Sequence, residues 1–353
     1  MGDTPSAASG RMEGHGYYTD HSQAQRAFTE VALDWLEQAT AEVDPPPAGM
    51  PFVIADLGAA GGGNSLDPMR RALAARRKDG PALVVHTDIA SNDFSALFEL
   101  VQSSPDSYLD APGVFALAEG RSFYVRLFPD GFLSLGWSSI AVHWLSELTT
   151  AIPDHIYSTF ARGDVRRSLQ RQSALDWHAF LNNRAAELRA SGRLILLGGA
   201  NTDDGRSGAE GLMDAANESL TTLVAEGLVR DTEYRRMTIP TWNRTAAEFA
   251  EPFTSGRMAG LLELRRSEFV VLPDPLYAAY QATADLDRYV ADVAASFRAA
   301  FEQSLWAALD SDRSAESREE VRRAFAAELQ GIIAADPERA ACSWRVVVLD
   351  VAR

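Results

Sequence analysis

The chain has 353 residues, 46% of them hydrophobic, which is enough for a full core in one large domain with a smaller subdomain. The formal net charge of −16 disfavours nucleic acid as a partner, because a phosphate backbone would be repelled. Cys342 is the only cysteine, which excludes a disulfide framework and a thiolate metal cluster. Neither a signal peptide nor an apolar run of roughly 20 residues, the length of a membrane span, is visible, so we expect a cytoplasmic protein without a membrane span.

The first part of the chain reads as alternating helices and strands. Residues 1–11 are small and polar, and we expect them to be disordered. Phe28, Trp35 and Leu36 fall on one face of a helix predicted over 22–43, which the proline-rich stretch after it ends. Short apolar runs predict buried strands, and amphipathic stretches between them predict helices. The strands are expected at 52–56 and 82–88, and the helices at 66–78 and 92–101.

The same alternation continues and then changes to longer helical stretches. Strands are predicted at 131–138, 193–199, 261–272 and 344–351, and helices at 165–191, 286–309 and 317–335. This order predicts an α/β fold, a doubly wound seven-stranded Rossmann-like sheet. Helical segments after residue 150 are expected to form a cap over the carboxyl ends of the strands, where such folds bind ligands. We assign 1–204 to the core, 205–258 to a helical cap, and 259–353 to late strands and further cap helices.

A glycine-rich turn follows the first strand, in the stretch PFVIADLGAAGGGNSL. The dinucleotide fingerprint G-x-G-x-x-G would need a glycine where Ala60 stands, which disfavours a nicotinamide-dependent oxidoreductase. The series Asp56, Gly58, Ala60 and Gly62 is closer to the turn of S-adenosylmethionine (SAM) enzymes. A glycine-rich loop without a ligand is the alternative.

A second acid, Asp88, ends the second predicted strand. In βαβ nucleotide sites an acid at this place accepts hydrogen bonds from the ribose hydroxyls. The competing interpretation is a helix N-cap, a role in which aspartate is also common.

Six stretches together resemble the SABATH methyltransferases, named for salicylic acid, benzoic acid and theobromine. They are YYTDHSQAQR, IADLGAAGGGNSL, HTDIASNDFSALF, RSFYVRLFPDGFLSLGWSSIAVHWLSELT, SGRLILLGG and EGLVRDTEYRRMTIPTW, in that order. The resemblance covers most of 12–245 and implies a SAM-dependent enzyme that forms methyl esters of small carboxylic acids, with S-adenosylhomocysteine (SAH) as the second product.

The resemblance also implies roles for individual residues. Cofactor contacts are expected at Tyr18, Ser22, Asp56, Gly58, Asn64, Asp88, Ile89, Ser122, Phe123 and Ser138. Gln25 and Trp144 are expected to hold the substrate carboxylate. Ile140, His143, Met213 and Trp242 are expected to line the substrate pocket.

Packing offers simpler interpretations of several of these residues. Trp144 could be core, and Gln25 could be a solvated helix residue. Met213 and Trp242 could be packing within the cap. His143 is more often a packed histidine than a general base, so we expect no catalytic proton transfer from it.

The expected chemistry needs neither a base nor a metal. A carboxylate is already ionised at pH 7, so the protein has only to hold it near the methyl carbon. The amide of Gln25 and the indole N–H of Trp144 are suitable donors. No cluster of histidines and acids has metal-ligand spacing.

The substrate is expected to be a free, medium-chain fatty acid. Ile140 stands where plant members usually carry a tyrosine, and Met213 where carboxyl-methylating relatives often carry a tryptophan. The alanine-rich, lysine-poor composition favours a bacterial source, which disfavours plant hormones as substrates. A benzoate- or salicylate-type acid and a catalytically silent SAM-binding protein remain the alternatives, and a homodimer is possible.

Overall fold

The structure is a computed structural model that describes residues 12, 13, 17, 23–77 and 80–353, with the backbone alone at 23–26. The expected disordered arm at 1–11 lies outside the described residues. So do Tyr18 and Ser22, and the side chain of Gln25.

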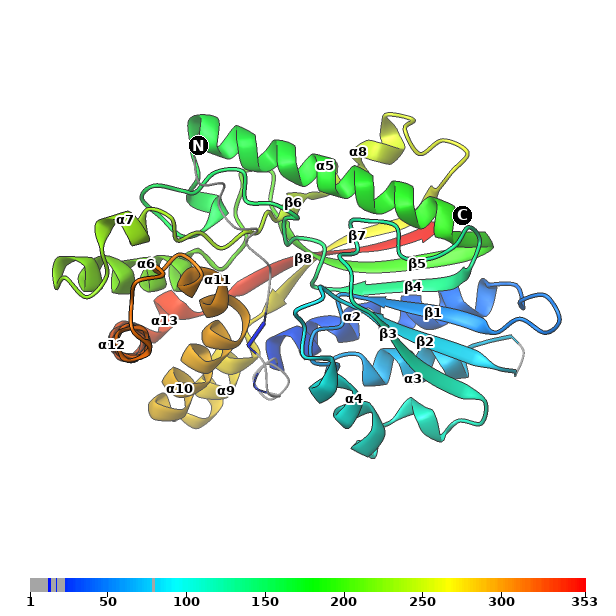
Figure 1. The fold of residues 1–353 in the computed structure, drawn as a ribbon, viewed down its shortest axis with the longest axis horizontal. Coiled ribbons are helices and arrows are strands. Elements are labelled where there is room, and N and C mark those ends of the chain that lie inside the picture. The colour runs from blue at the N-terminus through cyan, green and yellow to red at the C-terminus, as the bar shows by residue number, and fades with distance from the viewer. Residues whose placement is uncertain (1–11, 14–16, 18–22, 78–79) are drawn as a thin grey trace.

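One mixed sheet forms the centre of the molecule (Figure 1), with the strand order β3-β2-β1-β4-β5-β8-β7. The first five strands along the chain pair in parallel, and β8 is antiparallel to both β5 and β7. These seven strands confirm the predicted doubly wound sheet, and a short eighth strand, β6, pairs with β5. The strands are β1 (Phe52–Leu57), β2 (Ala82–Thr87), β3 (Val114–Glu119), β4 (Leu133–Ser139), β5 (Leu188–Asn201), β6 (Arg244–Thr245), β7 (Glu263–Pro273) and β8 (Ser343–Ala352).

Helices cover the sheet on both faces and extend past one end of it. They are α2 (Gln23–Glu42), α3 (Leu66–Ala74), α4 (Phe94–Ser103), α5 (Gly163–Glu187), α6 (Glu210–Ala225), α7 (Asp231–Tyr234), α8 (Ala246–Thr254), α9 (Pro275–Thr283), α10 (Leu286–Phe297), α11 (Gln303–Trp306), α12 (Ala315–Ala335) and α13 (Pro337–Ala340). Short 3₁₀ turns occupy η1 (Tyr108–Asp110) and η2 (Ser158–Phe160), and η3 (Arg298–Glu302) is a π-helix.

Alternation along β1 divides the core between the two faces of the sheet. Phe52 and Ile54 join the cluster formed with α2, α3 and α4, whereas Val53, Ala55 and Leu57 join the cluster under α5. Side chains of successive strand residues point to opposite faces, so a strand covered on both faces is apolar throughout. This is why the stretch FVIAD is apolar up to its last residue, the acid Asp56.

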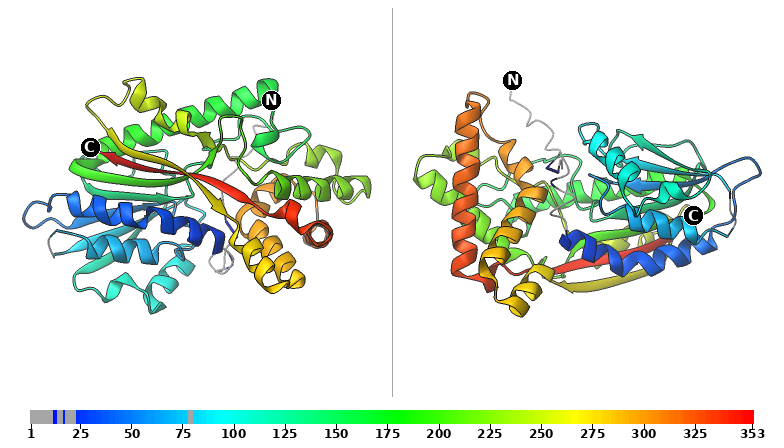
Figure 2. Two further views of the ribbon diagram at one scale, coloured as in Figure 1. Left: turned by 180° about the vertical axis from the view of Figure 1, so that it is seen from behind. Right: turned by 90° about the horizontal axis from the view of Figure 1, so that it is seen from below.

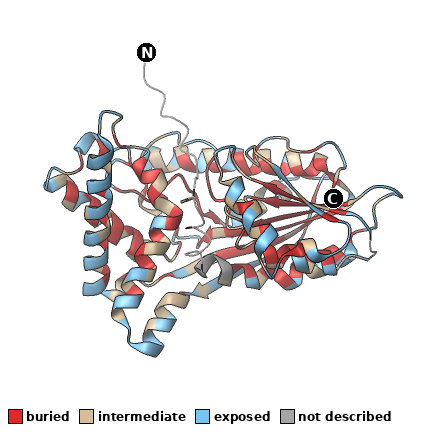
Figure 3. Cartoon of the chain, turned by 60° about the horizontal axis from the view of Figure 1, so that its bottom comes forward, coloured by how far each residue is buried: buried red, intermediate tan, exposed pale blue. Residues whose placement is uncertain are grey.

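The cap has a core of its own, built mainly from α6, α10, α11 and α12. Figure 2 shows these helices standing beside the sheet, and Figure 3 shows buried residues on their inner sides and exposed residues outside. The cap residues therefore pack mainly among themselves, and the functional site lies at the boundary between the cap and the sheet.

The placement of α8 differs from the expectation that 205–258 is cap. Phe249 of α8 is buried in the sheet cluster beneath α5, and the indole N–H of Trp177 donates to its carbonyl oxygen at 3.0 Å. Gly198 of β5 makes room for it, since a Cβ there would lie 2.8 Å from the Phe249 ring. This contact with a distant strand, which no local pattern reports, brings α8 to the sheet.

The helix expected at 286–309 is interrupted by the π-helix η3. A π-helical turn widens the backbone spiral and often occurs at functional sites. Here the turn carries Ala300 and Phe301, both of which line the pocket described next.

Candidate functional site

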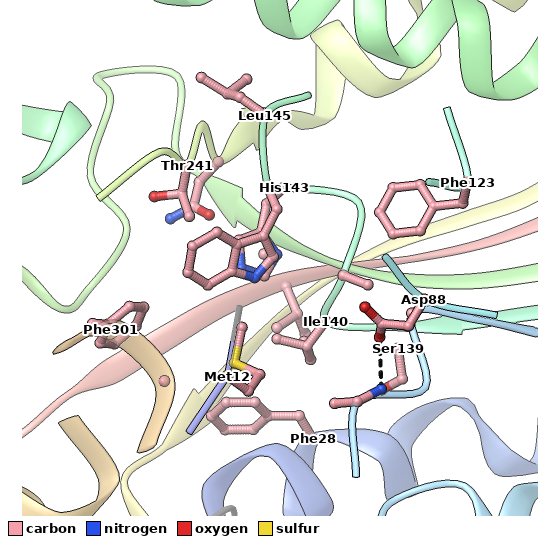
Figure 4. A pocket seen from close by; sticks show the side chains of 18 of the residues that line it. Met12, Phe28, Asp88, Phe123, Ser139, Ile140, His143, Leu145, Thr241 and Phe301 are labelled. Carbon is pink, nitrogen blue, oxygen red and sulfur yellow. Dashed lines mark hydrogen bonds between the residues drawn. The ribbon is translucent and has the colours of Figure 1, made fainter. Parts of the chain in front are cut away.

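A pocket lies where the carboxyl ends of the parallel strands meet the cap (Figure 4). Asp88, Phe123 and Ser139 lie at one end of it, and Thr241 and Phe301 at the other, with Ile140 between them. The lining residues come from sheet and cap together: Met12, Phe28, Gly58, Ala60, Asp88, Ile89, Ser122, Phe123, Tyr124, Ser139, Ile140, Ala141, His143, Trp144, Leu145, Ser146, Tyr157, Gly199, Thr241, Asn243, Ala300, Phe301, Trp344, Arg345 and Val346.

The glycine turn after β1 is pressed against the loop after β4. Gly58 has a φ of +90°, and a Cβ on it would lie 2.5 Å from the Cβ of Ala141. Its N–H and that of Ala59 both donate to the carbonyl of Thr87. Ala60 has a φ of +47°, in the left-handed region that favours glycine. The turn therefore keeps the conformation of the glycine pattern although this position is alanine.

Asp88 forms part of the pocket floor beside this turn. Its Oδ2 accepts the N–H of Ala60 at 2.8 Å, and its Oδ1 accepts the N–H of Ile89 at 2.7 Å. Desolvation raises the pKa of Asp88 to about 6, although the two backbone donors oppose the shift. The carboxyl is fixed in place, and both its oxygens keep lone pairs for hydroxyl donors in the pocket.

Asp56 faces the protein interior and not the pocket. Its Oδ2 accepts a hydrogen bond of 2.6 Å from Ser65 and lies 2.8 Å from Nδ1 of His86. The other ring nitrogen of His86 lies 2.7 Å from the Tyr108 hydroxyl. This buried network ties the turn to β2 and to η1, so Asp56 supports the cofactor turn from behind.

Phe123, a pocket wall near Asp88, is held by the last turns of α5. Arg184 donates to the carbonyls of Phe123 and Val125, and Asn183 donates to that of Tyr124. Glu187, paired with Arg184, accepts the N–H groups of residues 127 and 128. Several buried hydrogen bonds thus fix the loop that faces the turn.

Trp144 lines the opposite part of the pocket. The hydroxyl of Tyr124 lies 2.6 Å from the carbonyl of Trp144 and 3.0 Å from that of Val142, to which Arg244 also donates. The indole lies 6.2 Å from the ring of Phe301, and no described residue accepts its N–H. The backbone is fixed, and the indole donor remains available to a ligand.

Ile140 stands between these two ends with a φ of +51°. A β-branched residue in the left-handed region is an outlier that costs free energy, and such strain clusters at functional sites. Its N–H donates to the carbonyl of Leu197 at 2.7 Å, which holds the strained turn in place. The turn directs the chain from β4 towards His143 and Trp144.

One pocket thus combines the carboxyl of Asp88 with the indole N–H of Trp144, which has no acceptor among the described residues. The protein family described as SAM dependent carboxyl methyltransferase matches residues 7–347. The chain belongs to this family. It is the SABATH family that the six sequence stretches resemble, and the chain is therefore a SAM-dependent carboxyl methyltransferase.

Individual relatives of this SABATH methyltransferase agree with the assignment. "Methyltransferase LUC1" from Fusarium sp is 30% identical over 250 residues, which are 69% of this chain and 67% of that protein. "Indole-3-acetate O-methyltransferase 1" from Arabidopsis thaliana is 28% identical over 68% of this chain and 70% of the relative. A solved structure, "Loganic acid methyltransferase with SAH", has a TM-score of 0.74 and 20% identity, covering 97% of this chain and 98% of that one. This last likeness shows the fold.

The pocket of the methyltransferase suits its cofactor. Asp88 offers carboxylate oxygens for the ribose hydroxyls, and Ile89 and Phe123 offer apolar surfaces beside it. Gly58 lies in the lining, and a Cβ on it would clash with Ala141, so glycine is needed for the close contact between the turn and the loop after β4. Among the described residues, no group of three His, Cys, Asp or Glu side chains could hold a metal ion. In the same part of the chain, no helix has the length and apolar character to cross a membrane.

Eight of the sequence-predicted site residues line this pocket: Gly58, Asp88, Ile89, Ser122, Phe123, Ile140, His143 and Trp144. Ser138 is buried beneath it, where its hydroxyl donates to the carbonyl of Leu57. Asn64 lies in the turn but not in the lining. Gln25 belongs to α2, one turn before the pocket residue Phe28, and its side chain is outside the described residues.

Met213 and Trp242 do not line the pocket, which corrects the expectation for both. Met213 is fully buried in the cap cluster. Trp242 packs with Leu145 and Leu169 and donates its indole N–H to Glu248 at 3.2 Å. Thr241 and Asn243 line the pocket instead, because neighbouring residues of an extended segment point to opposite sides. Met213 is thus packing within the cap, whereas Trp242 packs against α5 and α8.

The pocket also contains residues that the sequence analysis missed. Phe28 was expected only as core, and Met12, Tyr157, Asn243 and Phe301 were not singled out. Residue 243 directly follows the last matched stretch, TIPTW, which is the one sequence signal that could have identified it. Met12 and Phe301 come from opposite ends of the chain, and no local pattern predicts their meeting.

Proposed function

We propose that this methyltransferase esterifies small, largely apolar carboxylic acids, with a flexible medium-chain acid as the preferred type. The observation that carries the proposal is the free indole N–H of Trp144 in the same pocket as the Asp88 carboxyl. Around it lie Met12, Phe28, Ile140 and Phe301, which offer apolar surface to the remainder of the acid.

SAM, when bound, supplies the methyl group: a carboxylate oxygen–carbon bond forms, the carbon–sulfur bond breaks, and a methyl ester and SAH result. The residues of the chain provide orientation and no proton transfer. Asp88 fixes the ribose end, and Trp144 donates to the carboxylate, with Gln25 proposed as its second donor. Positioning of this kind accounts for large rate accelerations without general base catalysis.

The expected preference for a flexible acid was based on two residues, Ile140 and Met213, and only one of them lies in the pocket. Met213 does not reach the pocket, so only Ile140 remains as an aliphatic replacement for an aromatic wall. Met12 gives new support, because methionine adapts to irregular apolar ligands. A benzoate-type acid is the second candidate, favoured by the rings of Trp144 and Phe301, whose planes are tilted by 33°.

The test is incubation of the purified protein with labelled SAM and a panel of straight-chain and aromatic acids. The product is identified as the methyl ester by its mass and by its sensitivity to mild base. We expect ester from at least one acid of medium length. If SAH binds but no acid in the panel is methylated, the protein is a silent binder and the proposed function is wrong.

A further inference from the structure

The loop after β4, residues 141–146, runs along the pocket, and its two edges are held in different ways. One edge pairs with another segment of main chain. The N–H of Leu145 donates to the carbonyl of Pro240 at 2.8 Å, and the N–H of Trp242 donates to the carbonyl of His143 at 2.8 Å. On the other edge, buried side chains take the place of a neighbouring segment and bond the main-chain groups, which need partners when buried.

Three buried side chains bond this second edge, and we call them the scaffold: Tyr124, Asp176 and Arg244. The hydroxyl of Tyr124 has two carbonyls within reach, that of Trp144 at 2.6 Å and that of Val142 at 3.0 Å. A hydroxyl carries one proton, so it can donate to only one of them at a time. Arg244 donates to the carbonyl of Val142 at 2.6 Å, which leaves the tyrosine proton for Trp144.

Arg244 is fully buried, and its donors serve main-chain carbonyls. Its second terminal nitrogen donates to the carbonyl of Ser173 in α5 at 2.6 Å, and its guanidinium lies 5.5 Å from the ring centre of Trp177. Among the described residues, no carboxylate forms an ion pair with it. A buried charge without such a partner costs free energy that an apolar side chain would avoid. What the guanidinium adds is a rigid fork that ties the loop to α5.

Asp176 holds the end of the same loop from the same helix. One of its oxygens accepts the N–H of Ser146 at 2.9 Å, and the other accepts the Ser146 hydroxyl at 2.5 Å. Desolvation raises the pKa of Asp176, and the bonds from Ser146 and the charge of Arg244 oppose this shift. Because Ser173 and Asp176 both belong to α5, one helix anchors the loop two residues before Trp144 and two residues after it.

We infer that the scaffold positions the indole of Trp144 for methyl transfer, with Arg244 as its central member. The inference rests on the proposed role of Trp144 as a carboxylate donor. Arg244 and Asp176 are not in the pocket lining, so they act through the loop and not on the acid itself. A displacement of about 1 Å at a reacting group can reduce a rate by about a hundredfold, so loss of one anchor should affect the transfer.

The experiment is a double-variant cycle on Arg244 and Trp144. Arg244→Met keeps much of the volume and removes the donors. It should reduce kcat/KM for the best acid by about tenfold, as expected for Trp144→Phe, and leave SAH affinity unchanged. Because Arg244 acts through Trp144, the double variant should also lose about tenfold and not about a hundredfold.

The cycle separates the two ideas. Losses that multiply in the double variant would overturn the inference and leave the proposed function intact. Full activity of Trp144→Phe by itself would overturn the proposed role of Trp144. Tyr124→Phe removes the hydroxyl and keeps the ring, so it gives a second cycle with the same expectation if Arg244→Met does not fold. Retained SAH binding shows that each variant is folded.

Two further variants separate hydrogen bonding from charge and from general loosening. Arg244→Lys keeps the charge without the two-armed fork, so it should show most of the loss; wild-type activity would overturn the inference. Arg193→Met is the matched control, because Arg193 is 5% exposed, donates to Asp350 at 3.1 Å and is not in the lining. It should lower stability and keep kcat/KM. An equal loss of kcat/KM in this control would also overturn the inference.

Discussion

The two ends of the pocket differ in how their polar groups are satisfied. In what we call the cofactor half, formed around Gly58, Asp88 and Phe123, backbone hydrogen bonds and the buried Asp56 network fix nearly every group. In the acceptor half, formed around His143, Trp144, Asn243 and Phe301, the backbone is fixed, but the indole N–H of Trp144 and the buried Nδ1 of His143 lack partners within the described residues.

The cofactor half has to bind one constant ligand, whereas the acceptor half has to select its acid from similar molecules. Among the described residues, the groups of the cofactor half are held in place before the ligand arrives, which lowers the ordering cost of binding. The acceptor half leaves specific donors and acceptors for the ligand to satisfy, and each unsatisfied group then acts against a wrong ligand. The variants below test whether this division is real.

Met213→Ala tests how far the acceptor half extends. Because Met213 lies in the closed cap cluster, the substitution should lower the free energy of unfolding by about 2–5 kcal/mol. The acid preferred by the enzyme should stay the same. Denaturant unfolding and a substrate panel check both points, and a change of preferred acid would place Met213 within the acceptor half.

Asp88→Ala tests the cofactor half. Loss of charge-assisted hydrogen bonds to the ribose should weaken SAH binding by about 1.5–3 kcal/mol, roughly 10- to 150-fold. Calorimetric titration measures this directly. Unweakened binding by a folded variant would show that Asp88 does not hold the ribose.

Trp144→Phe tests the acceptor half with little change of volume. Removing the indole donor should reduce kcat/KM about tenfold, or roughly 1.4 kcal/mol, and leave SAH affinity unchanged. Trp177→Phe is the matched control, since that indole already donates to the Phe249 carbonyl inside the core. The control should lower stability but keep kcat/KM, and similar kinetic losses in both variants would argue against a carboxylate contact at Trp144.

The pH dependence of SAH binding should come from Asp88. Its pKa is raised to about 6, so below pH 6 the free protein must lose a proton before the carboxylate can accept two hydroxyls. Affinity should therefore fall as pH decreases through 6, by at most about tenfold per pH unit. Asp88→Asn should abolish this dependence.

The same raised pKa has an opposite effect on the free protein. The contribution of Asp88 to folding is fully present below its usual value of 3.8 and is lost as pH rises through about 6. The decrease in the free energy of unfolding between about pH 4 and pH 6 should thus be larger in the wild-type protein than in Asp88→Asn, whose side chain does not titrate and whose single amide oxygen can accept only one of the two backbone N–H groups. An equal pH dependence in the two proteins would contradict the desolvation of this carboxyl.

The smallest expected effect is the dependence on substrate length. Each additional buried methylene contributes about 0.8 kcal/mol, so kcat/KM should rise roughly fourfold per carbon until the pocket is full. A series of straight-chain acids measures the slope, and SAH affinity should not vary along it. A flat series would remove the support for a flexible apolar substrate.

Much of the fold could be predicted from local patterns. Apolar runs and amphipathic stretches located six of the seven long strands and most of the long helices, with shifts at their ends such as β5 beginning at Leu188 instead of 193, whereas β3 was not predicted. The parallel pairing of Leu133 with Leu188 extends that strand, and pairing is a tertiary property. The π-helix in 286–309 was missed because it has no distinct local signature, and α9 was missed although Asp274 and Pro275 form a recognisable helix start.

The sequence by itself indicated the position of Gly58 and Asp88 in the cofactor half, because both follow strands that pair in parallel. Gly58 and Asp88 end adjacent parallel strands, and the carboxyl ends of such strands meet at one edge whatever the rest of the chain does. Resemblance to a family added His143 and Trp144, but could not say which way each side chain near them points. The resemblance likewise placed Trp242 at the pocket without showing which face of its segment meets the pocket.

Only the tertiary structure decided the acceptor half. Met12, Tyr157, Asn243 and Phe301 are far apart in sequence and meet because the cap packs against the end of the sheet. The orientation of Asn243 depends on its hydrogen bond to Tyr157, and the position of Trp144 depends on Tyr124 and Arg244. Hydrogen bonds between distant segments leave no periodic trace in a sequence, so they become visible only when the chain is folded.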